Sequence, residues 1–252
     1  LPPSGRLAVV NAVQPEFARD FLLPCLCDDV DALLALVHTC APLRDLVAGQ
    51  LTRLDCGKVG ERRRLSDGIV FDRNLCFLGA NLLELDVSQD YELVDSNELT
   101  DAGLGMIACR CPNLRVLTAW NRTRIQHSIK TLAYQCPYLE KVDLVFAREV
   151  ANELNPTEGV TNDSITALAR RCKNLRVLKV SGAPVTDVSL KAIGAHCNKL
   201  TTLYVDGCDS VRDAGVVAVA KGCAALTHLD LGVPRRGSLT SPSRVTARAI
   251  VA

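Results

Sequence analysis

Several short fragments of the chain contain residue types that could do chemistry, but none stands in the context that the chemistry requires. Gly103, Gly105 and Ala108 have the spacing of a dinucleotide-binding fingerprint, which needs a strand directly before its glycines. Here Thr100-Asp101 is a helix N-cap signal, so both glycines are expected inside a helix. No phosphate-binding loop or Gly-x-Ser-x-Gly motif occurs. The four histidines are scattered along the chain: His38, His127, His196 and His228. We therefore predict no enzyme activity, no catalytic residue and no cofactor.

The twelve cysteines are the other candidates for chemistry. No Cys-x-x-Cys pair exists, because Cys25 and Cys27, like Cys109 and Cys111, are separated by one residue, and no histidine lies at zinc-ligand spacing from them. An even number of cysteines would indicate disulfides in a small secreted protein. Here, however, the cysteines recur at a regular place in a repeat, where thiols behave as small apolar core residues. The pattern predicts a ladder of reduced, buried thiols and no metal site.

A repeat of about 25 residues organises the chain and must position any functional residue. In the copy at 172–197, alternating apolar residues at 175–180 are typical of a short buried strand, and Thr186-Asp187 starts a helix after a turn. A leucine begins the strand of each unit: Leu51, Leu82, Leu114, Leu139, Leu175, Leu200 and Leu226. In five of these units a cysteine stands three residues earlier: Cys111, Cys136, Cys172, Cys197 and Cys223.

This pattern is similar to leucine-rich repeats, and the segment CNKLTTLYVDGCDSVRDAGVVAVAKGC (197–223) resembles the cysteine-containing repeats of F-box/leucine-rich-repeat proteins. The resemblance covers roughly residues 48–252. It implies an α/β leucine-rich-repeat solenoid, a horseshoe with a parallel sheet on its concave face and helices on its convex face, behind a short all-helical N-terminal cap. We expect an F-box-like helical segment at 13–47 and a repeat domain of about seven units at 48–252. Residues 245–252 begin another copy of the helix pattern, so we expect the solenoid to continue beyond residue 252.

Composition and charge restrict the classes of partner. Hydrophobic residues make up 48% of the chain, enough for a large core. With 29 basic and 28 acidic residues the net charge is +1, which lacks the basic excess typical of nucleic-acid binding or of binding to an anionic membrane. No segment of 18 consecutive apolar residues occurs. We therefore expect an intracellular protein, cytoplasmic or nuclear, whose partners are proteins and not nucleic acid or membrane.

The N-terminal segment is where the resemblance implies an adaptor-binding F-box. Pro15 matches the family's opening proline. The apolar residues that would bind the adaptor are Leu22, Leu26, Leu33, Leu36 and Leu43. This sequence departs from the family at Leu43, where tryptophan is usual, and at Pro24 and Pro42, which interrupt expected helices. The alternative is a helical cap that shields the apolar edge of the first repeat.

Insertions and the tail carry further candidate sites. Arg62-Arg63-Arg64 within 57–74 could dock an acidic partner or belong to a solvated loop, and the acidic insertions 89–98 and 147–159 lie between a strand and its helix. Loops lengthened on one rim of a solenoid often belong to its binding face, although tolerance of insertion explains them as well. Ser238 follows Arg235-Arg236, the pattern of a basophilic kinase site, so we predict it as a phosphosite.

The concave face is the predicted partner-binding site. Residues that alternate with the buried leucines point to that surface and form a central column: Asp55, Asp86, Thr118, Asp143, Lys179, Tyr204 and Asp230. Flanking positions are Glu84, Val116, Trp120, Lys141, Val177, Ser181, Thr202, Asp206 and His228. We predict Trp120 and Tyr204 as anchors, because aromatic residues are enriched at interfaces. The alternative is that the column only keeps the strand face soluble.

Two functions of different classes follow. The resemblance implies a protein–protein interaction module that serves as the substrate-recognition subunit of an SCF-type ubiquitin ligase, with an adaptor on 13–47 and a target on the repeats. The alternative is a non-catalytic structural subunit of a large assembly, for example a cytoskeletal or ciliary complex, which the missing tryptophan favours.

Overall fold

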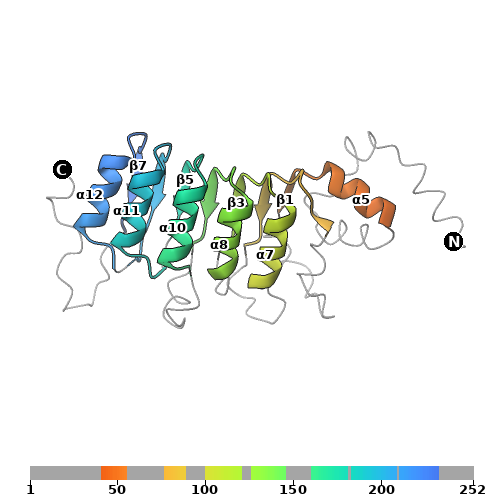
Figure 1. Ribbon diagram of the computed structural model, residues 1–252, viewed down its shortest axis with the longest axis horizontal. Helices are drawn as coiled ribbons and strands as arrows, with labels where there is room; N and C mark the ends of the chain where they lie inside the picture. Colours follow the sequence, from red (N-terminus) through yellow and green to blue (C-terminus); the bar gives the residue numbers. More distant parts are fainter. Residues whose placement is uncertain are drawn as a thin grey trace, which may run out of the picture.

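Strands and helices alternate along the chain and stack into two layers. The computed structural model describes residues 41–55, 77–88, 100–120, 126–145, 160–180, 183–208 and 210–232. The helices are α5 (Ala41–Gln50), α7 (Asp101–Arg110), α8 (Gln126–Gln135), α10 (Asn162–Arg171), α11 (Asp187–His196) and α12 (Asp213–Gly222). The strands are β1 (Arg53–Asp55), β2 (Glu84–Asp86), β3 (Val116–Thr118), β4 (Lys141–Asp143), β5 (Val177–Lys179), β6 (Thr202–Tyr204) and β7 (His228–Asp230). Helices α7 to α12 form a row along the long axis of the molecule, with the strands in a second layer beside them (Figure 1).

One parallel sheet runs through the described repeats in the order β1-β2-β3-β4-β5-β6-β7. Each strand pairs in register with the next, so that Leu54 lies beside Leu85 and Leu85 beside Leu117. Neighbouring strands are about 4.8 Å apart whereas packed helices need about 8–10 Å, which places the sheet on the inner side of the curve. The predicted α/β leucine-rich-repeat solenoid is thereby confirmed.

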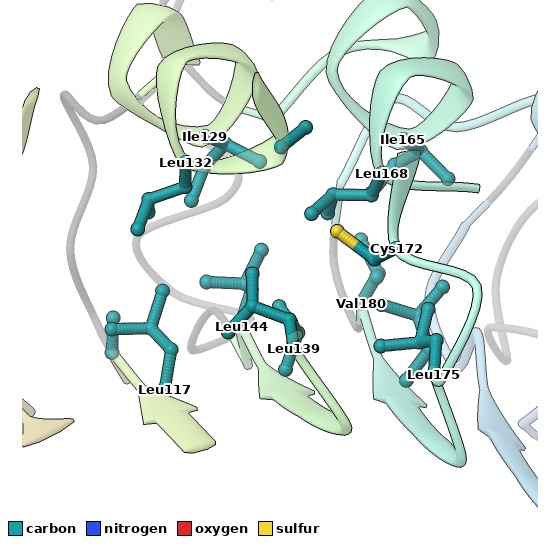
Figure 2. Packing of buried hydrophobic residues seen from close by; sticks show 14 of the residues in the cluster. Leu117, Ile129, Leu132, Leu139, Leu144, Ile165, Leu168, Cys172, Leu175 and Val180 are labelled. Atoms are coloured by element: carbon teal, nitrogen blue, oxygen red, sulfur yellow. The ribbon is translucent and has the colours of Figure 1, made fainter. Parts of the chain in front are cut away.

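The core lies between the two layers and is continuous from repeat to repeat. Six of the seven predicted strand-start leucines are buried, and Leu226 in the last described repeat is partly buried against the core. Figure 2 shows how Ile129 and Leu132 of α8 face Leu117 and Leu139 on the strand side, and how the next repeat copies the arrangement. Each unit therefore completes its core with side chains of its neighbour, as a solenoid requires.

Helix starts are capped both within a repeat and from the repeat before it. Thr100 is the N-cap of α7 and accepts a hydrogen bond from the Gly103 amide at 3.1 Å, so Gly103 and Gly105 lie inside a helix as predicted. The Asp101 carboxylate then reaches forward, where it accepts a bond from the Ser128 amide of α8 at 2.7 Å.

The same forward capping recurs further along the solenoid. Arg212, the N-cap of α12, makes no side-chain cap, but its amide donates to Asp187 Oδ1 at 2.7 Å. Asn162 Oδ1 accepts from the Thr186 amide at 3.0 Å in the same way. These bonds join orphan amides of one helix to the first turn of the preceding helix, and so they set the register between repeats.

The repeat cysteines form the predicted buried ladder at the other end of the helices. Cys111, Cys172, Cys197 and Cys223 are helix C-caps whose amides close the last helical turn. The Cys136 thiol donates to the Cys111 carbonyl at 3.3 Å, and the Cys172 thiol to the Cys136 carbonyl at 3.7 Å. Burial raises the thiol pKa from 9.0 to about 12 at Cys111, Cys136, Cys172 and Cys197. The thiols remain neutral near pH 8 and are held away from reagents.

Several predictions on the N-terminal part lie outside the described residues. This applies to Leu22, Leu26, Leu33 and Leu36 and to most of the segment 13–47. Helix α5 contains Leu43, whose side chain is not described, and has Pro42 at its second position, where a helix tolerates proline. The Leu51 amide donates to the Val47 carbonyl at 2.9 Å, so α5 leads directly into the first strand.

The thiol ladder leads to a labelling prediction. In the native protein at pH 8, Cys136, Cys172 and Cys197 should react with iodoacetamide far more slowly than exposed Cys109, because the neutral thiol is a poor nucleophile. Peptide-resolved mass spectrometry of labelling over time measures this. Replacing Cys172 with Ser should lower the free energy of unfolding by roughly 1–3 kcal/mol, since a hydroxyl enters an apolar site, whereas Cys109→Ser should be neutral. Equal labelling rates at Cys109 and Cys172 would contradict the ladder.

Candidate protein-binding site on the sheet

The predicted central column is a continuous row on the sheet. Its members are the third residues of the seven strands, and the register places each beside the next: Asp55, Asp86, Thr118, Asp143, Lys179, Tyr204 and Asp230. Their exposure differs along the row. Thr118 and Asp143 are buried. Asp55 and Asp86 on one side and Lys179 and Tyr204 on the other are half-buried, and Asp230 on the last described strand is exposed. In the middle of the row, neighbouring side chains therefore cover Thr118 and Asp143.

Four side chains from consecutive repeats are linked at the centre of this row. The Trp120 indole Nε1 donates to Asp143 Oδ1 at 2.8 Å, and Lys179 Nζ lies 3.0 Å from Asp143 Oδ2. The same ammonium lies 5.3 Å from the centre of the Tyr204 ring, within the range of a cation–π interaction. We call Trp120, Asp143, Lys179 and Tyr204 the central cluster.

Asp143 is the residue that holds the cluster together. Its exposed fraction is only 1%, and a carboxylate buried to that degree needs charged or hydrogen-bonding partners. Lys179 supplies the opposite charge and Trp120 a donor, one to each oxygen. Asp143 and Thr118 thus lie beneath the surface, and a partner would meet them through their neighbours. Exposed Trp120 and the half-buried Lys179 and Tyr204 are the members that a partner can contact directly.

Trp120 is presented to solvent in a fixed position. Its side chain is exposed to 46%, so it is not buried between repeats. Its amide donates to Ser88 Oγ at 3.2 Å, and its indole is held by Asp143. A tryptophan whose backbone amide and indole N–H are both hydrogen-bonded loses little conformational entropy on binding, which favours its use as an anchor.

Acidic groups lie on the N-terminal side of the cluster. Asp86 is half-buried in the central column and accepts a hydrogen bond from the Ser88 amide at 2.9 Å. Glu84, in the flanking row, has Arg53 at 3.7 Å, and both side chains are largely exposed. This side of the sheet is suited to a basic group of a partner beside Trp120. Of the predicted flanking residues, Ser181 lies outside the described residues.

The pattern within one repeat does not predict that Asp143 joins Trp120 to Lys179. The sequences of two adjacent repeats together do contain that information. Asp143 and Lys179 occupy the same place in adjacent units, so that in-register stacking makes them neighbours of opposite charge. Trp120 stands two residues beyond that place in the preceding unit and reaches across to it. Comparing equivalent positions of neighbouring units would have identified the ion pair.

Other kinds of site are not found in the described part of the chain. Within it, no group of three or more His, Cys, Asp or Glu side chains could hold a metal ion. The helices described in the structure are all too short or too polar to cross a membrane. Ser238, Arg62-Arg63-Arg64 and the acidic insertions lie outside the described residues.

Comparisons with known proteins agree with this architecture. A family model described as Leucine Rich repeat matches residues 171–194 and 196–220. An F-box protein of Arabidopsis thaliana, SKIP1, is 28% identical over 54% of this chain and 40% of its own length. F-box/LRR-repeat protein 4 of Bos taurus is 29% identical over 64% of this chain and 24% of its own length. A transport inhibitor response 1-like protein of Oryza sativa subsp. japonica is 27% identical over 53% of this chain and 27% of its own length.

A solved structure gives a much weaker likeness. The crystal structure of the Rad7 and Elc1 complex in yeast contains a chain that is 17% identical, with a TM-score of 0.30 over 97% of this chain and 75% of that one. The curated relatives confirm the resemblance to F-box/leucine-rich-repeat proteins. This chain spans between 24% and 40% of their lengths. Its repeats are a protein-interaction module, since solenoids of this kind bind partners on extended concave surfaces.

The role of Asp143 can be tested with the single tryptophan of the chain as probe. Replacing Asp143 with Ala should release the indole and leave the Lys179 ammonium without its partner. Acrylamide quenching of Trp120 fluorescence should increase, and the free energy of unfolding should fall by about 1–3 kcal/mol. Asp143→Asn, which keeps an acceptor oxygen, should have a smaller effect on quenching.

The control for this experiment is Asp230→Ala, a change in the same column three strands away. It should leave the fluorescence of Trp120 as in the parent protein. Unchanged quenching in Asp143→Ala would show that the indole is not held by this carboxylate.

Proposed function

We propose that this chain is the target-binding part of a substrate-recognition subunit of an SCF-type ubiquitin ligase. In this proposal the sheet face holds the target protein, the segment 13–47 holds the ligase adaptor, and the chain performs no chemistry itself. The protein would act in the cytoplasm or nucleus, where such ligases work. The names of the curated relatives support the ligase context.

The observation that carries the target-binding role is the central cluster. Trp120 is half-exposed, its backbone amide and indole are both hydrogen-bonded, and the Asp143–Lys179 ion pair joins it to Tyr204. Burying a charge for this arrangement costs free energy, and a surface that only needs to be soluble does not require it. Solubility alone is achieved by isolated polar side chains. Fixed aromatic residues beside charged groups are typical of interface centres.

The target that fits this surface combines apolar or aromatic residues with a basic one. Trp120 follows β3 by two residues and Tyr204 ends β6, and these strands are three steps apart in the sheet. With about 4.8 Å between neighbouring strands, β3 and β6 are roughly 15 Å apart, so one apolar residue of the target would cover Trp120 and a second would cover Tyr204. The basic residue would lie toward Glu84 and Asp86, on the acidic N-terminal side.

A structural subunit of a large assembly is the second candidate. It is favoured by Leu43, which stands where the resemblance implies tryptophan. On this alternative the sheet would bind a permanent neighbour, and 13–47 would serve as a cap on the first repeat. Binding to the adaptor separates the two candidates.

An adaptor pull-down tests the ligase role. The purified chain should retain the SCF adaptor protein, and the double substitution Leu36→Asp, Leu43→Asp should abolish retention, because two carboxylates would be buried without partners. Trp120→Ala should bind the adaptor like the parent chain. Failure of the parent chain to bind the adaptor would remove the ligase role and leave the structural subunit.

Substitution of the anchor tests target binding. Trp120→Ala should weaken the complex with a partner recovered from cells by about 2 kcal/mol, roughly 30-fold, as for a central hot-spot residue. Isothermal titration with the purified partner measures the change, and an unaltered unfolding midpoint would show that the fold is retained. The control is Met106→Ala, which truncates an exposed apolar side chain on α7 and should have no effect. An unchanged affinity in Trp120→Ala would place the partner elsewhere, and an equal loss in both variants would show that the effect is not specific to Trp120.

A further inference from the structure

Basic side chains line one edge of the solenoid, where each helix ends and the chain turns toward the next strand. The five turns that follow α7, α8, α10, α11 and α12, at 109–115, 134–140, 170–176, 195–201 and 221–227, contain eight exposed cations: Arg110, Arg115, Arg170, Arg171, Lys173, Arg176, Lys199 and Lys221. We call this set the basic rim. Within these turns the only carboxylate is Glu140, which pairs with Arg115 at 3.1 Å.

Acidic side chains gather at the opposite edge. Asp101, Asp163, Asp187 and Asp213 lie in the first turns of their helices. Acidic residues recur at one position of the repeat and basic residues at another. In-register stacking therefore aligns residues of the same charge in a row along each edge. The net charge of +1 hides this separation, because it sums 29 basic and 28 acidic residues over the whole chain without regard to their position.

The helix dipole explains part of the pattern but not all of it. Cations in the last helical turn and acids in the first are stabilising for each helix. Arg115 and Arg176, however, stand directly before strands β3 and β5, beyond the helical turns. The charge of Arg115 is balanced by Glu140, but exposed Arg176 gives the rim positive charge that the helix dipoles do not explain.

Two exposed tyrosines lie in the second of the five turns of the rim. Tyr134 and Tyr138 are exposed to 52% and 53%, and the Arg171 guanidinium lies 4.5 Å from the centre of the Tyr134 ring. The combination of tyrosine with arginine is enriched in protein interfaces. Burial lowers the pKa of nearby His196, and the positive charges of Lys173 and Arg170 lower it further, which reflects the positive potential here.

We propose that the basic rim is a second protein-binding site, which takes an extended acidic segment of a partner protein. From α7 to α12 the rim crosses four steps of roughly 10 Å, about 40 Å in total. An extended chain covers that length in about twelve residues. A segment with a carboxylate at every third residue would therefore meet one repeat at each step, and it would pass over the two tyrosines at the second turn.

The distribution of charge favours a protein segment over nucleic acid or membrane. Duplex DNA carries one charge per roughly 1.7 Å, about 24 charges over this length, against eight cations in the rim. The acidic edge on the other side of the molecule would oppose any large anionic surface. Four or five carboxylates of a single extended chain match the rim more closely.

The test uses the full chain and a fluorescein-labelled twelve-residue peptide with Glu at every third position and Ser and Gly between. Fluorescence anisotropy at low salt should show binding that weakens as salt is added, and the same peptide with Gln should not bind. The triple variant Arg170→Glu, Arg171→Glu, Lys173→Glu should bind the Glu peptide at least about tenfold more weakly.

A charge-matched control separates the rim from net charge. Arg44→Glu, Lys130→Glu, Lys191→Glu changes three exposed cations outside the rim and should bind within about twofold of the parent chain. Circular dichroism checks folding of both variants, and Arg170→Gln, Arg171→Gln, Lys173→Gln replaces the first if it does not fold.

Three results would overturn the proposal. The first is no binding of the Glu peptide, and the second is an equal loss in both triple variants. The third is tighter binding of a single-stranded oligonucleotide or of phosphatidylserine vesicles than of the peptide. Trp120→Ala should leave peptide binding unchanged. The proposal for the basic rim is therefore tested independently of the proposed target-binding site on the sheet.

Discussion

In-register stacking of repeats is the constraint on which the rest of this structure depends. No repeat can bury its own apolar face, so each strand lies beside the equivalent strand of the next unit and each apolar strand residue beside its counterpart, as Val142 lies beside Leu117 and Leu178. Two sets of polar bonds fix that register. Forward caps such as Asp101 to Ser128 join helix starts, and thiols such as Cys136 to the Cys111 carbonyl join helix ends. Both satisfy backbone groups that helix termini leave without partners.

Stacking converts a position within the repeat into a line on the surface. The third strand position becomes the central column, and the end of the helix becomes the basic rim. What a line can bind depends on how side chains in adjacent units combine. Asp143 beside Lys179 makes a buried ion pair that positions Trp120, whereas Arg171 beside Tyr134 makes an exposed pair. In-register stacking thus produces both the central cluster, whose side chains are fixed, and the basic rim, whose charges are exposed.

The sequence predicted the features that follow from the pattern within a single repeat. It did not predict the features that arise from contacts between two adjacent repeats. Leucine spacing was enough for the solenoid, the buried cysteines and the column, because each follows from the pattern inside a repeat. The burial of Asp143 and the forward cap from Asp187 to Arg212 arise only when a neighbour is added. The separation of charge was missed because net charge sums over the chain and discards position. The adaptor-binding leucines and Ser238 lie outside the described residues, so they stay predictions.

The sheet site and the basic rim lie on different parts of one body whose repeats interact with their nearest neighbours. In such a body a change at the surface of one repeat has little effect beyond the adjacent ones. Trp120 and Lys173 belong to different repeats and different faces, so their contributions to binding should be additive. Cys172 differs, because its thiol bonds to the repeat that carries Asp143 and its own repeat carries both Lys179 and Arg171. Loss of packing there would disturb both sites, which makes the core at this junction the place where the two surfaces share a structural support.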